Sequence, residues 1–315
     1  MIQMNAPEDN FLFIVGSPRS GTTILGEILD LHPEISQWYE PYFVWDRYFR
    51  QVPDDQRNEK DATPKVIGYI RKNFERHLRK CNCKFIVDKS PRNSLKIPFI
   101  RQIFPGARFV HIIRDGRDAT LSINREWNKR KAIVEGSSDN PGFKYTEAFR
   151  VMKAWLDRQP FWLDRFRALW FETHGHIFNK NRHLNRLRWH GEAGWGPRFR
   201  DWEKSFTTNT VLRFNAMQWE SCVSSSLKAL SKVEERQKLT IWYEDFVQRP
   251  GETIESVLNF IGAENASAFY DKLPDIKAGN FNKWRKAFTP DEIEQIRPIL
   301  TPALDELGYL EKWPW

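Results

Sequence analysis

The sequence predicts an α/β fold in which helices flank both faces of a parallel β-sheet. Three observations support it: short apolar runs recur, segments of helical spacing alternate with them, and a glycine-containing loop joins the first run to the first such segment. Continuous apolar runs are typical of strands that are buried on both sides. The predicted strands are residues 11–15, 84–88, 108–113 and 239–243.

The predicted helices follow the same alternation. Residues 21–31 carry apolar side chains at helical spacing and end at His32-Pro33. A capping signature at Thr289–Glu292 predicts a C-terminal helix that ends at Gly308. The other expected helices cover residues 95–104, 115–127 and 211–233.

Two segments depart from this alternation. Residues 39–80 are aromatic and then charged, and we expect them to be largely helical. Residues 128–210 are aromatic and basic and are far longer than an ordinary connection, which predicts a mostly helical insertion that covers a substrate site. Because predicted strands lie on both sides of this insertion, we expect residues 1–315 to form a single domain.

Composition restricts the class of protein. The 315 residues include 49 Lys and Arg against 41 Asp and Glu, a net charge of +8, which favours an anionic partner. The chain has no apolar run long enough to span a membrane and does not start like a secretory signal, so we expect a cytoplasmic protein. The three cysteines, Cys81, Cys83 and Cys222, fit a reducing compartment and are expected to be ordinary thiols.

The loop after the first predicted strand is suited to a phosphate group. It reads Gly16-Ser-Pro-Arg-Ser-Gly-Thr-Thr23 and leads directly into a helix, whose N-terminal N–H groups attract anions. The hydroxyl groups of Ser20, Thr22 and Thr23 add further donors. The sequence therefore predicts a P-loop-type sheet.

This loop differs from that of nucleotide triphosphatases in one position. The glycine spacing is the same, but Thr22 stands where those enzymes have a lysine, and the cationic residue is Arg19 instead. Metal-assisted phosphoryl transfer uses that lysine together with an acidic residue that holds magnesium. Here Asp88 ends the second predicted strand, but Lys89 follows it and disfavours a divalent cation. We therefore expect a site that binds anions without a metal.

Taken in order, these motifs resemble those of sulfotransferases that use 3′-phosphoadenosine-5′-phosphosulfate (PAPS). The loop is similar to the family's 5′-phosphosulfate loop, P-[KR]-S-G-T-T, and Arg114 with Ser122 eight residues on is similar to its 3′-phosphate pair. Residues 88–92, 243–246 and 282–286 resemble further family segments, the last being a basic loop that closes over the nucleotide. The resemblance covers residues 11–309.

Within that family, the chain is more similar to tyrosylprotein-like and bacterial members than to cytosolic phenol or steroid enzymes. The loop is followed by Leu31-His-Pro33 and then by Glu40. The histidine base and the Lys-x-x motif of the cytosolic enzymes are not found.

The resemblance implies an in-line transfer of the sulfuryl group from PAPS to a hydroxyl or amine acceptor, with adenosine 3′,5′-bisphosphate (PAP) as product. It implies Glu40 as general base, with Lys89 and Arg19 as further catalytic residues. A histidine is the alternative base: His174, His176 or His190. The implied cofactor-binding residues are Arg19, Ser20, Gly21, Thr22, Thr23, Arg114, Ser122, Tyr243, Lys283 and Trp284, of which Tyr243 and Trp284 are expected to pack on or bond to the adenine.

Two other functions stay open from the sequence. One is a kinase-like phosphotransferase on the same scaffold, and the other is a non-catalytic binder of an acidic polymer or nucleic acid. The spacing of Arg114 and Ser122 favours the sulfotransferase and argues against nucleic acid as the partner. The acceptor is expected to be a small molecule, a glycan or a peptide, and the sequence predicts neither which of these it is nor the oligomeric state.

Overall fold

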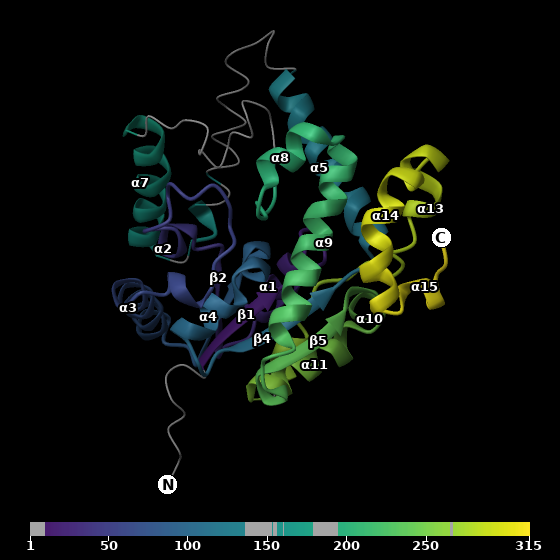
Figure 1. Cartoon of the computed structure of the whole chain (residues 1–315). Coiled ribbons are helices and arrows are strands. Elements are labelled where there is room, and N and C mark those ends of the chain that lie inside the picture. Colours follow the sequence, from purple (N-terminus) through teal and green to yellow (C-terminus); the bar gives the residue numbers. More distant parts are fainter. Residues whose placement is uncertain (1–9, 136–152, 154–155, 160, 179–194, 265–266) are drawn as a thin grey trace.

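The computed structural model describes residues 10–135, 153, 156–159, 161–178, 195–264 and 267–315. Its centre is a sheet of five parallel strands in the order β2-β3-β1-β4-β5 (Figure 1). Helices pack against this sheet, which confirms the predicted α/β fold. The strands are β1 Phe11–Val15, β2 Ile35–Tyr39, β3 Phe85–Lys89, β4 Arg108–Ile113 and β5 Lys238–Trp242.

Four of the strands were predicted to within one residue, but β2 was missed. β2 is an edge strand that pairs only with β3, and its sequence, Ile-Ser-Gln-Trp-Tyr, has no continuous apolar run, because Ser36 and Gln37 interrupt it. Residue 39, which the sequence placed at the start of a helical segment, is instead the last residue of this strand. The missed strand matters because it ends next to Glu40.

The two faces of β1 pack against different helices. Phe13 faces one side, where its ring lies 5.9 Å from that of Phe74 on α3 (Pro64–Cys81). Ile14 faces the other side and belongs to the cluster that includes Leu25 of α1 (Thr22–Leu29) and Ile254 of α11 (Pro250–Ile261). Alternate side chains of one strand therefore bury two separate layers of helices.

A third apolar cluster joins the long helices α5 (Gly116–Glu135), α9 (Val211–Leu230) and α14 (Pro290–Glu306). The predicted capping box is present at the start of α14, where Thr289 and Glu292 bond to each other's backbone N–H. The remaining elements are α2 Tyr42–Trp45, η2 Glu59–Asp61, η3 Pro91–Leu95, α4 Ile97–Ile103, α7 Trp162–Phe178, α8 Trp202–Thr208, η5 Glu235–Gln237, α10 Tyr243–Gln248, α12 Ser267–Tyr270, α13 Trp284–Ala287 and α15 Tyr309–Lys312.

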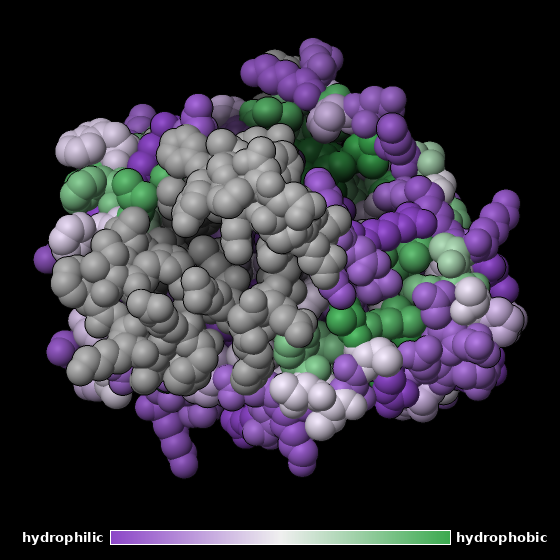
Figure 2. All heavy atoms as spheres, turned by 90° about the horizontal axis from the view of Figure 1, so that it is seen from above, coloured by the Kyte–Doolittle hydropathy of each residue, from purple (hydrophilic) through white to green (hydrophobic). Residues whose placement is uncertain are grey.

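The segment predicted as an insertion, residues 128–210, is described only in part. Its described portions include the end of α5, which runs to Glu135 instead of the predicted residue 127, together with α7 and α8. No helix in the described part of the chain is both long and apolar enough to cross a bilayer. Seen from above, polar and charged residues dominate the described surface, with smaller apolar groups between them (Figure 2).

The cysteines differ from the expectation of free thiols. Cys81 ends α3, and Asn82 adopts a left-handed conformation with φ of 51° that turns the chain back. This turn brings Cys83 to a Cα–Cα distance of 5.2 Å from Cys81, and the two form a disulfide. Cys222 is free and buried.

A substitution of Gly16 tests how closely the start of the phosphate loop packs against β4. A Cβ at this position lies 2.5 Å from the backbone carbonyl oxygen of Ile112 in β4, which cannot move without opening the sheet. We expect Gly16→Ala to lower the free energy of unfolding by about 1–3 kcal/mol in urea titrations. Gly68→Ala is the control: a Cβ there meets nothing within 4 Å in α3, so it should be neutral or stabilise by up to about 1 kcal/mol. Equal stability of both variants contradicts this packing argument.

Candidate active site

The candidate site lies at the carboxyl-terminal edge of the sheet. In a parallel sheet all strands end at one edge, where ligands of α/β proteins bind. Lys89 pairs with Ile14 on one side and with Tyr39 on the other, so the ends of β1, β2 and β3 are level. The phosphate loop follows β1 at this edge, and each of the other strands ends at or next to one predicted site residue: Glu40, Lys89, Arg114 and Tyr243.

The loop between β1 and α1 is shaped to present N–H groups. Arg19 and Gly21 both adopt left-handed conformations, with φ of 65° and 93°. Gly21 is the N-cap of α1 and supplies no side-chain cap, so the first N–H groups of that helix have no acceptor within it. Ser20 and Thr22 are buried beside them and Thr23 is half-buried. Such a loop binds an anion at the positive end of the helix.

Arg114, directly after β4, connects this loop to the rest of the site. Its Nη1 donates to the carbonyl of Arg19 at 2.8 Å, and its Nη2 donates to the carbonyl of Asn280 at 2.8 Å. Its guanidinium lies over the ring of Tyr243 at 4.3 Å. Its Nε is buried and has no hydrogen-bond partner in the described chain, so one donor is left for a ligand.

Ser122 belongs to the same cluster. It lies on α5, and its hydroxyl accepts a hydrogen bond from Nε of Arg19 at 3.0 Å. The two halves of the predicted nucleotide site are thus in direct contact, since Arg19 bonds to Ser122 through its side chain and to Arg114 through its carbonyl.

Asp118 holds the segment that borders this cluster. It lies on α5 between Arg114 and Ser122 and is almost fully buried. Its carboxylate accepts three backbone N–H groups, from Asn282, from Lys283 at 2.9 Å and from Trp284 at 3.0 Å. The sequence analysis missed this role, although Asp118 stands inside the Arg114 motif.

The side chains of this bordering segment fall into two groups. Asn280 donates from Nδ2 to the hydroxyl of Tyr243 at 2.7 Å, and exposed Lys283 bonds to the side chain of Asn280. Trp284, in contrast, is only 1% exposed and packs beneath Arg117 and Trp315. Trp284 was expected to pack on or bond to the adenine, but its indole belongs to the third apolar cluster, so the structure does not bring it to the open side of the site.

Glu40 and Lys89 form an ion pair at the end of β2 and β3. The Nζ of Lys89 donates to Oε1 of Glu40 at 2.7 Å and lies 4.1 Å from the ring centre of Tyr39. The Lys89 side chain is 1% exposed and that of Glu40 is 18% exposed, so Glu40 is the more solvent-accessible member of the ion pair.

The environment of Glu40 keeps it ionised. Burial alone raises the pKa of this carboxyl, but the charge of Lys89, its hydrogen bond, and smaller contributions from Tyr42 and Arg92 outweigh burial and lower the pKa below its ordinary value. Glu40 also has a left-handed backbone with φ of 46°, held by hydrogen bonds of its own N–H to Lys89 and of Tyr42 N–H to its carbonyl. Strained backbone of this kind is typical of functional sites.

A second set of largely buried charged side chains lies close to this ion pair. The guanidinium of Arg92 lies 3.9 Å from the ring centre of Tyr42 and forms ion pairs with Asp55 at 3.4 Å and with Asp46 at 3.8 Å. Tyr42 and Asp46 belong to α2 and its C-cap, whereas Arg92 lies in η3 and Asp55 in a loop, so their proximity has no signal in the sequence spacing. Their contacts fix the turn after Glu40.

Asp88, which the sequence raised as a possible metal ligand, is enclosed. Its two oxygens accept hydrogen bonds from Trp45 Nε1 at 2.6 Å and from Asn93 Nδ2 at 2.9 Å. Burial raises the pKa of Asp88 to about 6. Among the described residues, no cluster of three or more His, Cys, Asp or Glu side chains is arranged to hold a metal ion.

The histidines named as alternative bases are not placed by the structure. His174 and His176 lie in α7, but their side chains are outside the described part, and so is His190.

Comparison with known proteins agrees with this geometry. The model of the sulfotransferase family matches residues 12–174, which is more than half of the 315 residues. The chain belongs to the sulfotransferase family. Protein-tyrosine sulfotransferase A of Caenorhabditis elegans is 28% identical over 142 residues, 40% of this chain and 35% of that protein. The human protein-tyrosine sulfotransferase 1 is 26% identical over 137 residues, 40% of this chain and 35% of that protein.

A bacterial relative matches over a similar stretch. The nodulation protein NoeE of Sinorhizobium fredii is 23% identical over 130 residues, 36% of this chain and 31% of that protein. The matches thus span about a third of the length of these relatives. They confirm the predicted affinity with tyrosylprotein-like sulfotransferases.

Solved structures share the fold. A sulfotransferase domain from the curacin biosynthetic pathway superposes with a TM-score of 0.51 at 14% identity, covering 92% of this chain and 96% of its own. A sulfotransferase of Mycobacterium avium gives a TM-score of 0.50 at 12% identity, covering 96% of this chain and 78% of its own.

Asp118 should be a positioning residue for the segment that borders the site. In Asp118→Ala, three backbone N–H groups lose a charged acceptor, and each such bond contributes about 1.5–3 kcal/mol. Hydrogen exchange should therefore speed up by about tenfold or more at the amides of 282–284. Asp245→Ala is the matched control, since its carboxylate is 42% exposed and pairs with Arg249. Unchanged exchange at these amides in Asp118→Ala refutes the role.

Proposed function

We propose that the protein is a PAPS-dependent sulfotransferase that transfers the sulfuryl group to a hydroxyl or amine acceptor and releases PAP. The observation that carries this proposal is the contact between two anion sites, the loop with Arg19 and the pair Arg114 and Ser122. PAPS carries phosphate groups at both ends of its ribose, so two adjoining cationic sites suit it. Family membership supports the same reaction.

The residues of the chain divide the work of binding this donor. The N–H groups at the start of α1 and the hydroxyls of Ser20, Thr22 and Thr23 suit the 5′-phosphate. The positive charge of the Arg114 guanidinium and the hydroxyl of Ser122 suit the 3′-phosphate. Tyr243 and exposed Lys283 border this region.

Glu40 and Lys89 are suited to the transfer itself. The acceptor oxygen forms a bond to sulfur while the bond from sulfur to the 5′-phosphate oxygen breaks, and the acceptor proton goes to Glu40. Its lowered pKa keeps Glu40 ionised and able to accept that proton at neutral pH. Once Glu40 is neutral, the charge of Lys89 is no longer compensated by it and stabilises the negative sulfonate, while Arg19 stabilises the leaving phosphate.

The named relatives supply a first acceptor class to test. Two of them are protein-tyrosine sulfotransferases and one is a nodulation protein. We therefore place tyrosine peptides first in a labelled-sulfate screen, followed by glycans and small phenols.

Donor binding is tested by thermal unfolding without magnesium. PAP at 100 times its dissociation constant should stabilise the protein by about 2.7 kcal/mol, a rise in Tm of several degrees. ATP should stabilise it much less, and Arg114→Ala should reduce the effect of PAP. No shift with saturating PAP, or a larger shift with magnesium and ATP, rejects PAPS as the donor.

The role of Glu40 is tested by Glu40→Gln. We expect turnover with an acceptor from the screen to fall by about 10²–10⁴-fold, because the amide cannot accept the proton, while the affinity for PAP changes little. Since the base must be ionised and its pKa is lowered, wild-type turnover should decline through this group only below its ordinary pKa of 4.5. Glu252→Gln, at an exposed carboxylate on α11, is the control. Full turnover in Glu40→Gln excludes it as the base.

A further inference from the structure

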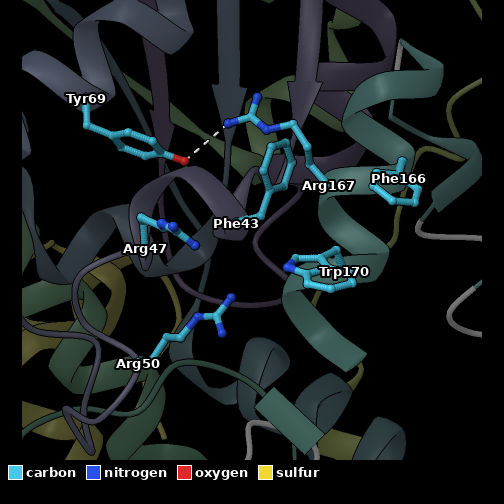
Figure 3. Close-up of a pocket in the computed structure, with 7 residues that line it drawn as sticks. All are labelled: Phe43, Arg47, Arg50, Tyr69, Phe166, Arg167 and Trp170. Carbon is cyan, nitrogen blue, oxygen red and sulfur yellow. Dashed lines mark hydrogen bonds between the residues drawn. The ribbon is translucent and has the colours of Figure 1, made fainter. Parts of the chain in front are cut away.

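A cavity of about 540 Å³ lies between α2, α3 and α7 and is separate from the phosphate loop (Figure 3). α2 begins two residues after Glu40, and its Phe43 lines the cavity. The chain just before α7 contacts the end of β2, because Nε2 of Gln159 donates to the carbonyl of Tyr39 at 2.9 Å. The cavity is therefore next to the turn that carries the proposed base.

The apolar part of the cavity is made of aromatic rings. Phe43 and Tyr69 come from α2 and α3, and Phe166 and Trp170 come from α7. Phe166 is 57% exposed and Trp170 is 54% exposed, a high value for rings of this size. Exposed rings around a hollow provide flat faces for the ring of a ligand.

Three arginines add positive charge to the same cavity. Figure 3 shows the guanidinium groups of Arg47, Arg50 and Arg167 around the space between Phe43, Tyr69 and Trp170. Arg47 is exposed and forms no ion pair with the described part of the chain.

Arg167 is fixed in place and only partly neutralised. It bonds to Asn73 at 2.7 Å and to the Tyr69 hydroxyl at 3.2 Å, and it shares the carboxylate of Asp164 with Arg76. Partial burial, followed by the charge of Arg167, lowers the pKa of Arg76. One carboxylate thus serves two guanidinium groups, and this wall of the cavity keeps excess positive charge.

We propose that this cavity binds a small ring-bearing organic anion, with a carboxylate, sulfate or phosphate held by Arg47 and Arg167 and a ring packed on the exposed indole of Trp170. Its volume lies in the range of pockets for small molecules, and guanidinium groups favour oxyanions through paired hydrogen bonds. Because the cavity adjoins the turn of Glu40, the bound molecule is the acceptor, and this assignment rests on the proposed function. The acceptor then carries its own negative charge in addition to the reacting hydroxyl or amine.

Binding is tested with two fluorescent probes of the same shape, 8-anilinonaphthalene-1-sulfonate and its neutral analogue N-phenyl-1-naphthylamine. The sulfonate should bind at least tenfold more tightly than the neutral analogue, and saturating PAP should not displace it. Arg47→Ala should weaken the sulfonate by about five- to tenfold and leave the neutral probe unchanged, whereas Trp170→Ala should weaken both. Arg236→Ala is the control. Arg236 is exposed and precedes β5, the edge strand on the side of the sheet away from β2, so its substitution should leave the affinity for both fluorescent probes unchanged.

Several results overturn the proposal. These are equal affinity for the two probes, wild-type binding of the sulfonate by Arg47→Ala, or displacement of the sulfonate by PAP. Competition decides the ligand class: displacement by 1-naphthyl phosphate but not by tetraglutamate supports a ring-bearing small anion, and the reverse result overturns it in favour of an acidic peptide. Circular dichroism shows whether each variant is folded, and Phe166→Ala replaces Trp170→Ala if the latter unfolds.

The assignment as acceptor site has its own test. With an acceptor from the labelled-sulfate screen, Arg47→Ala should raise KM by about fivefold or more with a smaller change in kcat and an unchanged affinity for PAP. An unchanged KM overturns the assignment. If PAP itself does not bind the wild type, the donor proposal fails, and that failure is distinct because the probe titrations do not depend on PAP.

Discussion

The arrangement of the site depends on the guanidinium group of Arg114. It bonds to the carbonyls of Arg19 and Asn280 and lies over the ring of Tyr243, so it joins the phosphate loop, the end of β4, the start of α10 and the segment before α13. An arginine suits this position because its planar group bonds in several directions and remains charged in a buried setting. A lysine at this position cannot donate hydrogen bonds in the same set of directions. The carbonyl of Arg19, whose backbone is left-handed, then loses its hydrogen-bond donor. The same group that organises the site also contributes the charge that an anion requires.

The site has two regions that differ in position and in charge, one suited to binding a nucleotide and one proposed to carry out the transfer. Around β1, β4 and β5 the side chains are cationic or hydroxylated and suit a nucleotide with two phosphate positions. Around β2 and β3 the charges are paired, with Lys89 against Glu40 and Arg92 against Asp55 and Asp46. Pairing allows a carboxylate to stay ionised in a largely buried place, where burial alone favours its neutral form. In the proposed reaction, proton transfer to Glu40 changes the net charge of that region by one unit at the moment when the sulfonate needs a positive neighbour.

The sequence predicted the central strands and the phosphate loop because both are encoded locally. β1 is a continuous apolar run, β4 is apolar apart from Arg108 and His111, and the loop has a fixed spacing of glycines and hydroxyls. The sequence did not predict β2, because Ser36 and Gln37 interrupt its apolar residues and it shows neither a continuous run nor a regular alternation. The burial of Trp284 could not be predicted either, because an aromatic residue beside a basic loop has the same local pattern whether its ring faces a ligand or the core. Asp118 and the Cys81–Cys83 disulfide were missed since each depends on where the backbone turns, not on composition.

The position of the missed strand has a consequence for the acceptor. Because β2 ends at Tyr39, the chain must leave the sheet edge at Glu40, and it does so through a strained residue that leads into α2. The next turn carries Phe43 and Arg47 into the cavity under α7, so the proposed base and one wall of that cavity belong to a single short segment. The proposed acceptor site and Glu40 are thus linked through only a few backbone bonds. If Arg47 holds an anionic acceptor as proposed, the same short segment carries both a contact to the acceptor and the proposed base, which favours a fixed geometry between them.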